Sequence, residues 1–206
     1  MVDHLPTTRR VVALTFDAGA NDAGVAKIVA TLRATRTSAT FFLTGRWCQI
    51  FPAQARLIAS RYPIGNHTVD HADLTTRSPS AVRSEVMTAQ RQITRIAGRD
   101  PRPLFRFPYG AYDAARLRLV NGLGYAAIGW TVDTLGWEGA SGGQSAASVQ
   151  GRVLAGLRPG EIVLMHVGSN PTDRSTLDAD ALGSVIAAVR GRGYTFVTLP
   201  SSIQAP

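Results

Sequence analysis

The sequence has one cysteine, one lysine and no long hydrophobic run. The single Cys48 excludes an internal disulfide, and its apolar neighbours favour a buried small side chain. No stretch approaches the ~20 apolar residues that a membrane-spanning helix needs, so we expect no membrane span. The first residues lack the basic and then apolar segments of a signal peptide, so an export signal is absent from this chain or removed.

The charge is unbalanced towards arginine. Lysine and arginine number 22 against 14 acidic residues, which gives a net charge of +8, and Lys27 is the only lysine. A basic surface attracts anionic polymers, including bacterial wall material. The arginines are spread along the chain without a zinc-finger, RNA-binding or basic-zipper pattern, so we expect no nucleic-acid partner.

Strand-like and helix-like segments alternate along the whole chain. The expected strands cover residues 11–16, 40–43, 104–105, 125–132, 162–165 and 194–198. This order predicts a single α/β domain over residues 1–206, with a core of about 11–198 and about seven parallel strands. It fits a distorted or incomplete (β/α) barrel at least as well as an open doubly wound sheet, and periodicity alone does not separate the two. Phe42, Phe107 and Trp130 are assigned to the core.

Helix signals lie between these strands. Serine as N-cap and proline at the first helical position predict a long helix that starts at Ser78-Pro79. Asp22 and Asp113 are expected to cap two further helices, and a last helix is expected to follow Asp178.

Residues that could do chemistry follow the expected strands directly. Asp17, Arg106, Asp133 and His166 each come at or just after a strand end. Two loops, 135–144 and 168–175, also follow such ends, where substrate-binding loops belong. Because α/β folds gather the carboxyl ends of parallel strands at one edge, this pattern predicts an enzyme.

His67 and His71 form the one histidine pair with metal-ligand spacing. Side chains four residues apart are neighbours on a helical face, and imidazole suits zinc and related transition metals. On their own, two histidines at this spacing favour a structural or surface role.

Each other candidate also has a simpler interpretation. Asp17 could cap a helix, Asp133 could cap the loop that follows it, and His166 could be a hydrogen-bonded core histidine. Arg106 could be a surface ion-pair partner, and Trp137 could serve only in packing.

Five motifs occur in an order that resembles a known family. They are TFDAG at 15–19, HTVDH at 67–71, RFPY at 106–109, WTVDTLGW at 130–137 and LMH at 164–166. They resemble the motifs of the polysaccharide deacetylases, the NodB-homology domain of carbohydrate esterase family 4, and the match spans residues 11–197. The resemblance implies a distorted (β/α) barrel and metal-dependent removal of acetyl groups from N-acetylated sugars or acetylated xylan.

The resemblance also implies the proton-transfer roles. Asp17 would be the general base that takes a proton from the attacking water, and Arg106 would keep its carboxylate oriented and ionised. His166 would protonate the leaving amine, while Asp133 would fix the tautomer of His166 and raise its pKa.

The remaining roles concern the metal and the substrate. His67 and His71 would hold a divalent metal, zinc in the first place with cobalt or nickel as alternatives. The Tyr109 backbone N–H would help to hold the oxyanion, and Trp137 would line the groove under the sugar.

Two positions depart from the family pattern. The first motif usually carries two adjacent aspartates, and Ala18 replaces the second, which serves as a metal ligand. Metal binding should therefore be weak, unless Asp22 or Asp70 completes the site. In the fourth motif, Gly136 stands where the family often has an aspartate before the tryptophan.

Two functions from different classes follow. The first is a hydrolase that deacetylates a polysaccharide, either peptidoglycan or chitin-like oligomers. The second is a catalytically impaired homologue that binds carbohydrate. The survival of base, acid and both histidines favours the enzyme. We expect a monomer that acts outside the membrane or at the cell wall.

Overall fold

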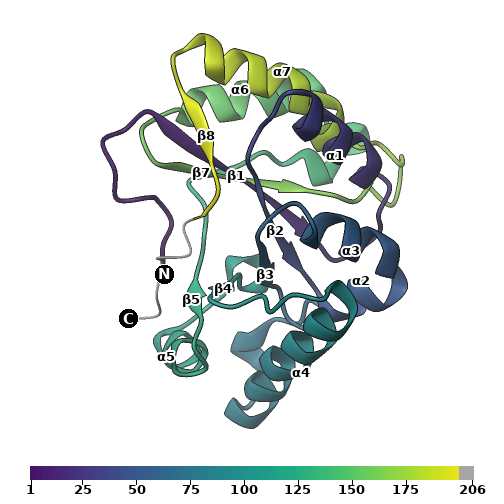
Figure 1. Ribbon diagram of the computed structural model, residues 1–206, viewed down its shortest axis with the longest axis vertical. Helices are drawn as coiled ribbons and strands as arrows, with labels where there is room; N and C mark the ends of the chain where they lie inside the picture. The colour runs from purple at the N-terminus through teal and green to yellow at the C-terminus, as the bar shows by residue number, and fades with distance from the viewer. Residues whose placement is uncertain (200–206) are drawn as a thin grey trace. The chain divides into compact units, whose positions relative to one another are not determined.

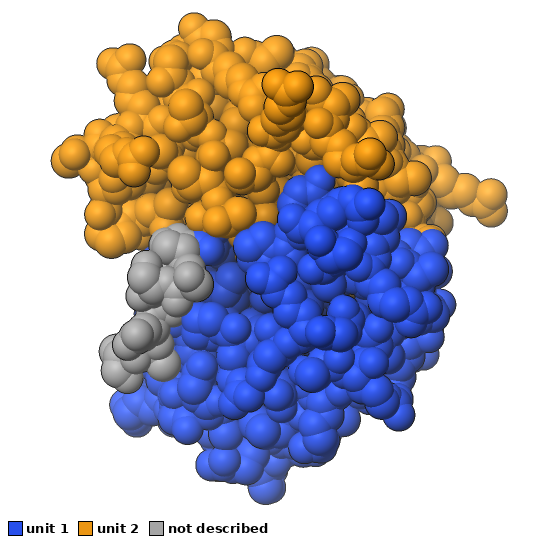
Figure 2. Space-filling model, in the orientation of Figure 1, with its two compact units in different colours: residues 1–2, 41–129, 199–206 blue, residues 3–40, 130–198 orange. Residues whose placement is uncertain are grey.

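The computed structural model describes residues 1–199, which divide into two compact units (Figure 2). Unit 1 contains residues 1–2, 41–129 and 199, and unit 2 contains residues 3–40 and 130–198. Each unit therefore joins stretches that are far apart in the sequence. The single domain expected over residues 1–206 stays a prediction.

Unit 1 is built on a parallel sheet with the strand order β5-β4-β3-β2. Its strands are β2 (Thr40–Leu43), β3 (Ile64–Asn66), β4 (Leu104–Phe105) and β5 (Ala126–Ala127). Its helices are α2 (Gly45–Ile50), α3 (Pro52–Ala59), α4 (Pro79–Ala97) and α5 (Ala114–Gly122), with 3-10 turns η1 (Leu74–Thr76) and η2 (Pro108–Gly110). Figure 1 shows α4 as the long helix of this unit.

Unit 2 is built on a parallel sheet with the strand order β8-β1-β7-β6. Its strands are β1 (Val11–Ala18), β6 (Val132–Asp133), β7 (Glu161–His166) and β8 (Thr195–Val197). Its helices are α1 (Val25–Ala34), α6 (Ala146–Gly156) and α7 (Leu177–Gly191), with 3-10 turns η3 (Gly136–Glu138) and η4 (Ala140–Gly142). Every residue of β1 is buried, as expected for a central strand, and β1 pairs with β7 on one side and β8 on the other (Figure 1).

The alternation of helices with parallel strands confirms the predicted α/β class of the distorted or incomplete (β/α)-barrel type. Residues 1–199 contain eight strands, close to the seven expected. The single strand expected over 125–132 is wrong, because two short strands, β5 and β6, replace it. The Ile128 N–H still bonds to Phe105 of β4, whereas the Thr131 N–H bonds to Ile162 of β7, both at 2.8 Å. The chain thus changes neighbours between these two residues.

Two of the expected helix caps are confirmed. The Ser78 hydroxyl accepts a hydrogen bond from the Ala81 N–H, and α4 starts at Pro79. The Asp113 carboxylate accepts one from the Arg116 N–H at 2.8 Å at the start of α5. Such bonds satisfy backbone donors that the first helical turn leaves unpaired.

Asp22 as the cap of α1 is wrong. The helix starts at Val25, its N-cap is Gly24, and no side chain caps it. The Gly24 N–H instead donates to the Val167 carbonyl at 2.8 Å, which ties this turn to the end of β7. Asp178 also lies inside the first turn of α7 rather than before it.

The expected core residues are buried with one exception. Phe42, Phe107 and Cys48 are buried, and burial raises the pKa of the Cys48 thiol to about 12. Trp130 is only partly buried, so its assignment to the core is wrong. No helix within residues 1–199 is long and apolar enough to cross a membrane.

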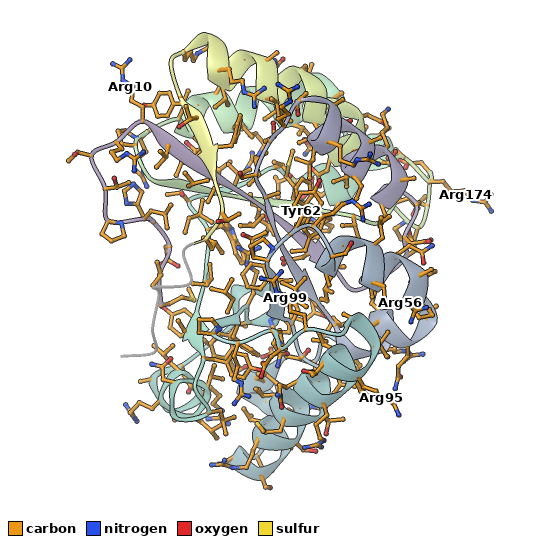
Figure 3. The ribbon with its side chains drawn as sticks, viewed as in Figure 1. Arg10, Arg56, Tyr62, Arg95, Arg99 and Arg174 are labelled. Atoms are coloured by element: carbon orange, nitrogen blue, oxygen red, sulfur yellow. The ribbon has the colours of Figure 1, made fainter. Side chains whose placement is uncertain are left out.

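Several arginines of unit 1 lie separately on its surface. Arg56 and Arg95 are exposed and project from α3 and α4 (Figure 3). Arg99 instead folds back and donates to the Tyr62 carbonyl at 3.4 Å. This arrangement agrees with the spread of the arginines along the sequence.

Asn66 at the end of β3 connects three parts of unit 1. Its side chain is fully buried, and its Nδ2 donates to the Val86 carbonyl at 2.9 Å and to the Tyr125 hydroxyl at 3.0 Å. Its Oδ1 accepts from the Thr68 N–H at 2.9 Å. The residue therefore fixes the loop that carries the two candidate metal ligands.

Asn66→Ala should lower the free energy of unfolding by about 2–4 kcal/mol, because buried groups at three places lose their partner. Tyr125→Phe removes one of these hydrogen bonds and should cost about 1 kcal/mol. Urea denaturation of both variants measures whether Asn66→Ala loses more stability than Tyr125→Phe. Equal losses in the two variants would mean that the Asn66 network does not hold this loop.

Candidate active site

The register between β1 and β7 brings Asp17 and His166 together. Their Cα atoms are direct partners in the parallel pair, and the Val167 N–H donates to the Asp17 carbonyl at 3.1 Å. Side chains directly opposite each other on neighbouring strands point to the same face. Asp17 is 7% exposed and the His166 side chain 28% exposed, so both groups are sheltered but the imidazole stays accessible.

Asp133 lies on the next strand and holds a loop. On β6, Asp133 pairs with Leu164, which lies two positions before His166 on β7. Its Oδ1 accepts a hydrogen bond from the Leu135 N–H at 2.9 Å, as the loop-capping alternative proposed. Within residues 1–199, no hydrogen bond joins Asp133 to His166, and the role of Asp133 in fixing the tautomer of His166 stays a prediction.

Asp178, in the first turn of α7, lies beside His166, although the sequence indicated it only as a helix start. Its Oδ2 accepts a hydrogen bond from the His166 backbone N–H at 2.8 Å and lies 3.7 Å from His166 Nδ1. Its Oδ1 accepts one from the Thr134 hydroxyl at 2.7 Å. The carboxylate is 3% exposed, and no spacing motif links it to His166.

Three carboxylates set the protonation of His166. Burial lowers the pKa of its imidazole, but Asp178, followed by Asp17 and Asp133, raises it, and the net pKa lies above its ordinary value. The carboxylates thus favour the protonated imidazole, which is the form that a general acid needs.

In unit 1, the fold fixes the tautomer of His67. Its Nδ1 lies 2.8 Å from the Arg106 carbonyl, which can only accept, so Nδ1 carries the proton. The other ring nitrogen, Nε2, is then the one that can bind a metal. The His71 ring meets the His67 ring edge-on, with ring centroids 4.7 Å apart.

Arg106 is a buried residue and not a surface ion-pair partner. Its guanidinium is fully buried and donates to the carbonyls of Ile128 and Gly129 at 3.3 and 3.0 Å. It also lies 4.2 Å from the centre of the Phe42 ring, in a cation–π contact. A buried guanidinium needs such partners, because burying an unpaired charge is costly.

Strained backbone marks the loops that carry these residues. Thr68, His71 and Tyr109 adopt left-handed φ values of 69°, 67° and 59°. Such conformations cost about 1–3 kcal/mol each in residues other than glycine and cluster at functional sites. Tyr109 is 71% exposed, and its ring centroid lies 4.5 Å from that of His71.

The residues fit a divalent metal only in part. His67 and His71 offer two imidazoles, the ligand type that zinc takes. Ala18 at the end of β1 is fully buried and has no donor atom. Among residues 1–199, no group of three or more His, Cys, Asp or Glu side chains is placed to hold a metal, so neither Asp22 nor Asp70 completes one.

The two expected substrate loops contact each other. The Asn170 side chain, in the loop after β7, donates to the carbonyls of Trp137 and Glu138 at 3.0 and 2.8 Å. Trp137 itself is 49% exposed, so about half of its surface is open to solvent. An exposed indole on a fixed backbone is suited to stack against a ligand.

The raised pKa of His166 predicts a pH-dependent stability. A histidine whose pKa is higher in the folded state stabilises the fold fully below its unfolded pKa of about 6.5, and this stabilisation is lost as pH rises through the folded pKa. The free energy of unfolding of the wild type, minus that of His166→Gln, should therefore fall as pH rises above about 6.5. Urea denaturation between mildly acidic and mildly alkaline pH measures it, and the titration of Glu161 cancels because both proteins share it. A difference that grows with pH would mean that burial dominates.

Comparison with known proteins gives a consistent family. The sequence profile described as polysaccharide deacetylase matches residues 4–128. A peptidoglycan-N-acetylglucosamine deacetylase of Bacillus cereus is 33% identical over 97% of this chain and 70% of its own length. A chitooligosaccharide deacetylase of Azorhizobium caulinodans is 31% identical over 92% of each chain.

Solved structures agree. The crystal structure of a peptidoglycan N-acetylglucosamine deacetylase superposes with a TM-score of 0.88 at 32% identity, over 97% of this chain and 91% of the other. A family 4 carbohydrate esterase pseudoenzyme from Bacillus anthracis superposes with a TM-score of 0.83 at 26% identity, over 93% of this chain and 64% of that one. The chain thus spans less than two thirds of the pseudoenzyme. With both sequence and structure matched over most of its length, the chain belongs to the polysaccharide deacetylases, the NodB-homology domain of carbohydrate esterase family 4.

Proposed function

We propose that the protein is a hydrolase that removes acetyl groups from an N-acetylated polysaccharide. The observation that carries this proposal is the direct pairing of Asp17 with His166 at the ends of β1 and β7. A carboxylate and an imidazole whose pKa is raised, side by side, supply one group that can accept a proton and one that can donate it. Membership of the deacetylase family supplies the reaction class.

The reaction needs one proton taken and one proton given. Asp17 accepts a proton from the water that attacks the acetyl carbonyl carbon. His166 donates a proton to the amide nitrogen as the carbon–nitrogen bond breaks. The products are acetate and a free amine on the sugar, and together the two transfers are worth several orders of magnitude in rate.

Residues of unit 1 complete the proposed machinery. Arg106 is assigned the role of keeping the base ionised and oriented, as the family resemblance implies. The backbone N–H of Tyr109, held in a left-handed turn, donates to the oxyanion that forms on the acetyl group.

His67 and His71 are the proposed ligands of a divalent metal, with zinc as the first candidate. When bound, such an ion polarises the acetyl carbonyl and lowers the pKa of a coordinated water. The fixed tautomer of His67 presents Nε2 for this purpose. With Ala18 in place of a carboxylate, we expect weak binding.

The proposed substrates are peptidoglycan and chitin-like oligomers. Relatives of this chain are named for deacetylation of peptidoglycan and of chitooligosaccharides. The net charge of +8 favours peptidoglycan, whose polymers carry acidic groups. Exposed Trp137 would stack against the apolar face of a sugar ring. Action on such polymers implies a location outside the membrane or at the cell wall.

Asp17→Asn and His166→Ala should each lower acetate release from N-acetylglucosamine oligomers or peptidoglycan by about 10²- to 10⁴-fold, because each removes a proton-transfer group. Asp180→Asn, which removes an exposed carboxylate paired with Lys27, should keep wild-type activity. Acetate is measured with added zinc or cobalt and with a chelator, and acetylated xylan tests O-acetyl release.

Two outcomes would contradict this proposal. Near-full activity of either variant would refute its assigned role. Absence of acetate release by the wild type from all three substrates would favour the carbohydrate-binding homologue instead.

Ala18→Asp should tighten zinc binding, because it restores a carboxylate beside the end of β1. In the metal-free protein, a carboxylate at this fully buried position should lower the melting temperature, and zinc should recover it. Calorimetric titration and thermal unfolding with and without zinc measure both effects. His67→Ala is the control and should abolish zinc binding. Equal zinc affinity of wild type and Ala18→Asp would show that position 18 does not face the metal.

A further inference from the structure

We propose that Asp178, in the space left by Gly136, is the positioning residue that orients the His166 imidazole for proton transfer. The proposal rests on the proposed function of His166 as the acid. It assigns to α7 a role that the sequence motifs gave to Asp133.

Asp178 is held in place against the backbone of His166. Its Oδ2 accepts from the His166 N–H at 2.8 Å, and its Oδ1 accepts from the Thr134 hydroxyl at 2.7 Å. The side chain is 4% exposed. A buried carboxylate with two donors from two separate segments has little freedom to move, which suits a group that must orient another.

The imidazole of His166 has one nitrogen ready for this carboxylate. Within residues 1–199, His166 Nδ1 is buried and has no hydrogen-bond partner, and Asp178 Oδ2 lies 3.7 Å away. A small rotation of the ring would bring these atoms to hydrogen-bond distance, and catalytic hydrogen bonds are often long before substrate binds. A proton on Nδ1 that faces Asp178 leaves Nε2 as the nitrogen that acts on the leaving amine.

Gly136 makes room for this arrangement. A Cβ built on Gly136 would collide with Asp178 Oδ1 and would lie 2.6 Å from its Cγ. The φ of Gly136 is not in the left-handed region, so its backbone does not require glycine. Space for Asp178 therefore explains this glycine. A carboxylate from α7 occupies the volume that an aspartate at position 136 would need.

The other carboxylates near His166 have different tasks. Asp133 accepts from the Leu135 N–H and holds its own loop. Asp17 is the proposed base on the neighbouring strand. Both add negative charge near the imidazole, but Asp178 is the carboxylate within ion-pair distance of Nδ1.

Asp178→Asn removes the negative charge of the side chain but can keep its hydrogen bonds. The asparagine Oδ1 can accept from the His166 N–H, and its Nδ2 can donate to the Thr134 hydroxyl. That hydroxyl can in turn donate to the Leu164 carbonyl, 3.0 Å away. The hydrogen bonds thus survive while the negative charge is lost. Asp180→Asn, in the same helical turn but exposed and paired with Lys27, is the matched control for helix charge.

The primary readout is the pKa of His166, followed by NMR in the full chain. The chain has four histidines, and His166→Gln identifies the signal. Asp178→Asn should lower this pKa by about 1 unit, because an opposite charge at ion-pair distance is removed. The alkaline limb of kcat/KM should move by the same amount, with KM nearly unchanged. Asp180→Asn should shift neither.

Gly136→Ala provides an independent variant. The added methyl group should displace the carboxylate and lower the pKa of His166 as well, but it should have no further effect on that pKa in the Asp178→Asn background. Gly151→Ala is its control, since a Cβ there meets nothing within 4 Å. An unchanged pKa in both Asp178→Asn and Gly136→Ala would overturn the proposal, even if both lost stability. A protein in which His166→Ala keeps full activity would instead refute the proposed function, while the NMR shift would still decide whether Asp178 orients the ring.

Discussion

The pairing of β1 with β7 is the constraint on which the proposed chemistry depends. The two strands pair in parallel over six consecutive positions, from Val12 with Glu161 to Asp17 with His166. A slip of one residue would turn every side chain of one strand to the other face. The apolar residues of both strands are buried, which makes such a slip costly. Hydrophobic packing along the strands thus fixes the relative position of two polar groups at their ends.

In unit 1, hydrogen bonds hold the candidate site residues in place, and several of these residues have strained backbone conformations. Arg106 supplies both a buried guanidinium and the carbonyl that orients His67, so one residue connects two candidate roles. The Asn66 side chain accepts a hydrogen bond from the Thr68 N–H and so holds the loop that follows β3. The left-handed backbone of Thr68 is unfavourable for a β-branched residue. Unfavourable backbone conformations persist only where surrounding contacts hold them, and these hydrogen bonds are such contacts.

The sequence predicted what depends on local signals. The bounds of β2 and β4 and the Ser78 and Asp113 caps follow from neighbouring residues and were correct. The chain around Gly129 read as one strand because its apolar character is continuous, although hydrogen bonding divides it between two neighbours. Asp178 was missed as a partner of His166, because only the packing of the first turn of α7 against β7 brings the two together. Gly136 was the one sign in the sequence of the space that Asp178 fills. A glycine does not show which residue occupies the space beside it.

The two departures from the family pattern therefore have different physical meanings. At position 136, where the family often has an aspartate, the Asp178 carboxylate occupies the space beside the glycine and lies 3.7 Å from His166 Nδ1. At position 18, a buried alanine ends β1, and no third ligand is placed for a metal within residues 1–199. A site that had simply decayed would show no compensation at either place. A carboxylate therefore fills the space beside position 136, whereas residues 1–199 place no third metal ligand to make up for Ala18. Metal affinity, more than acid–base chemistry, is then the property in which this chain should differ from its relatives.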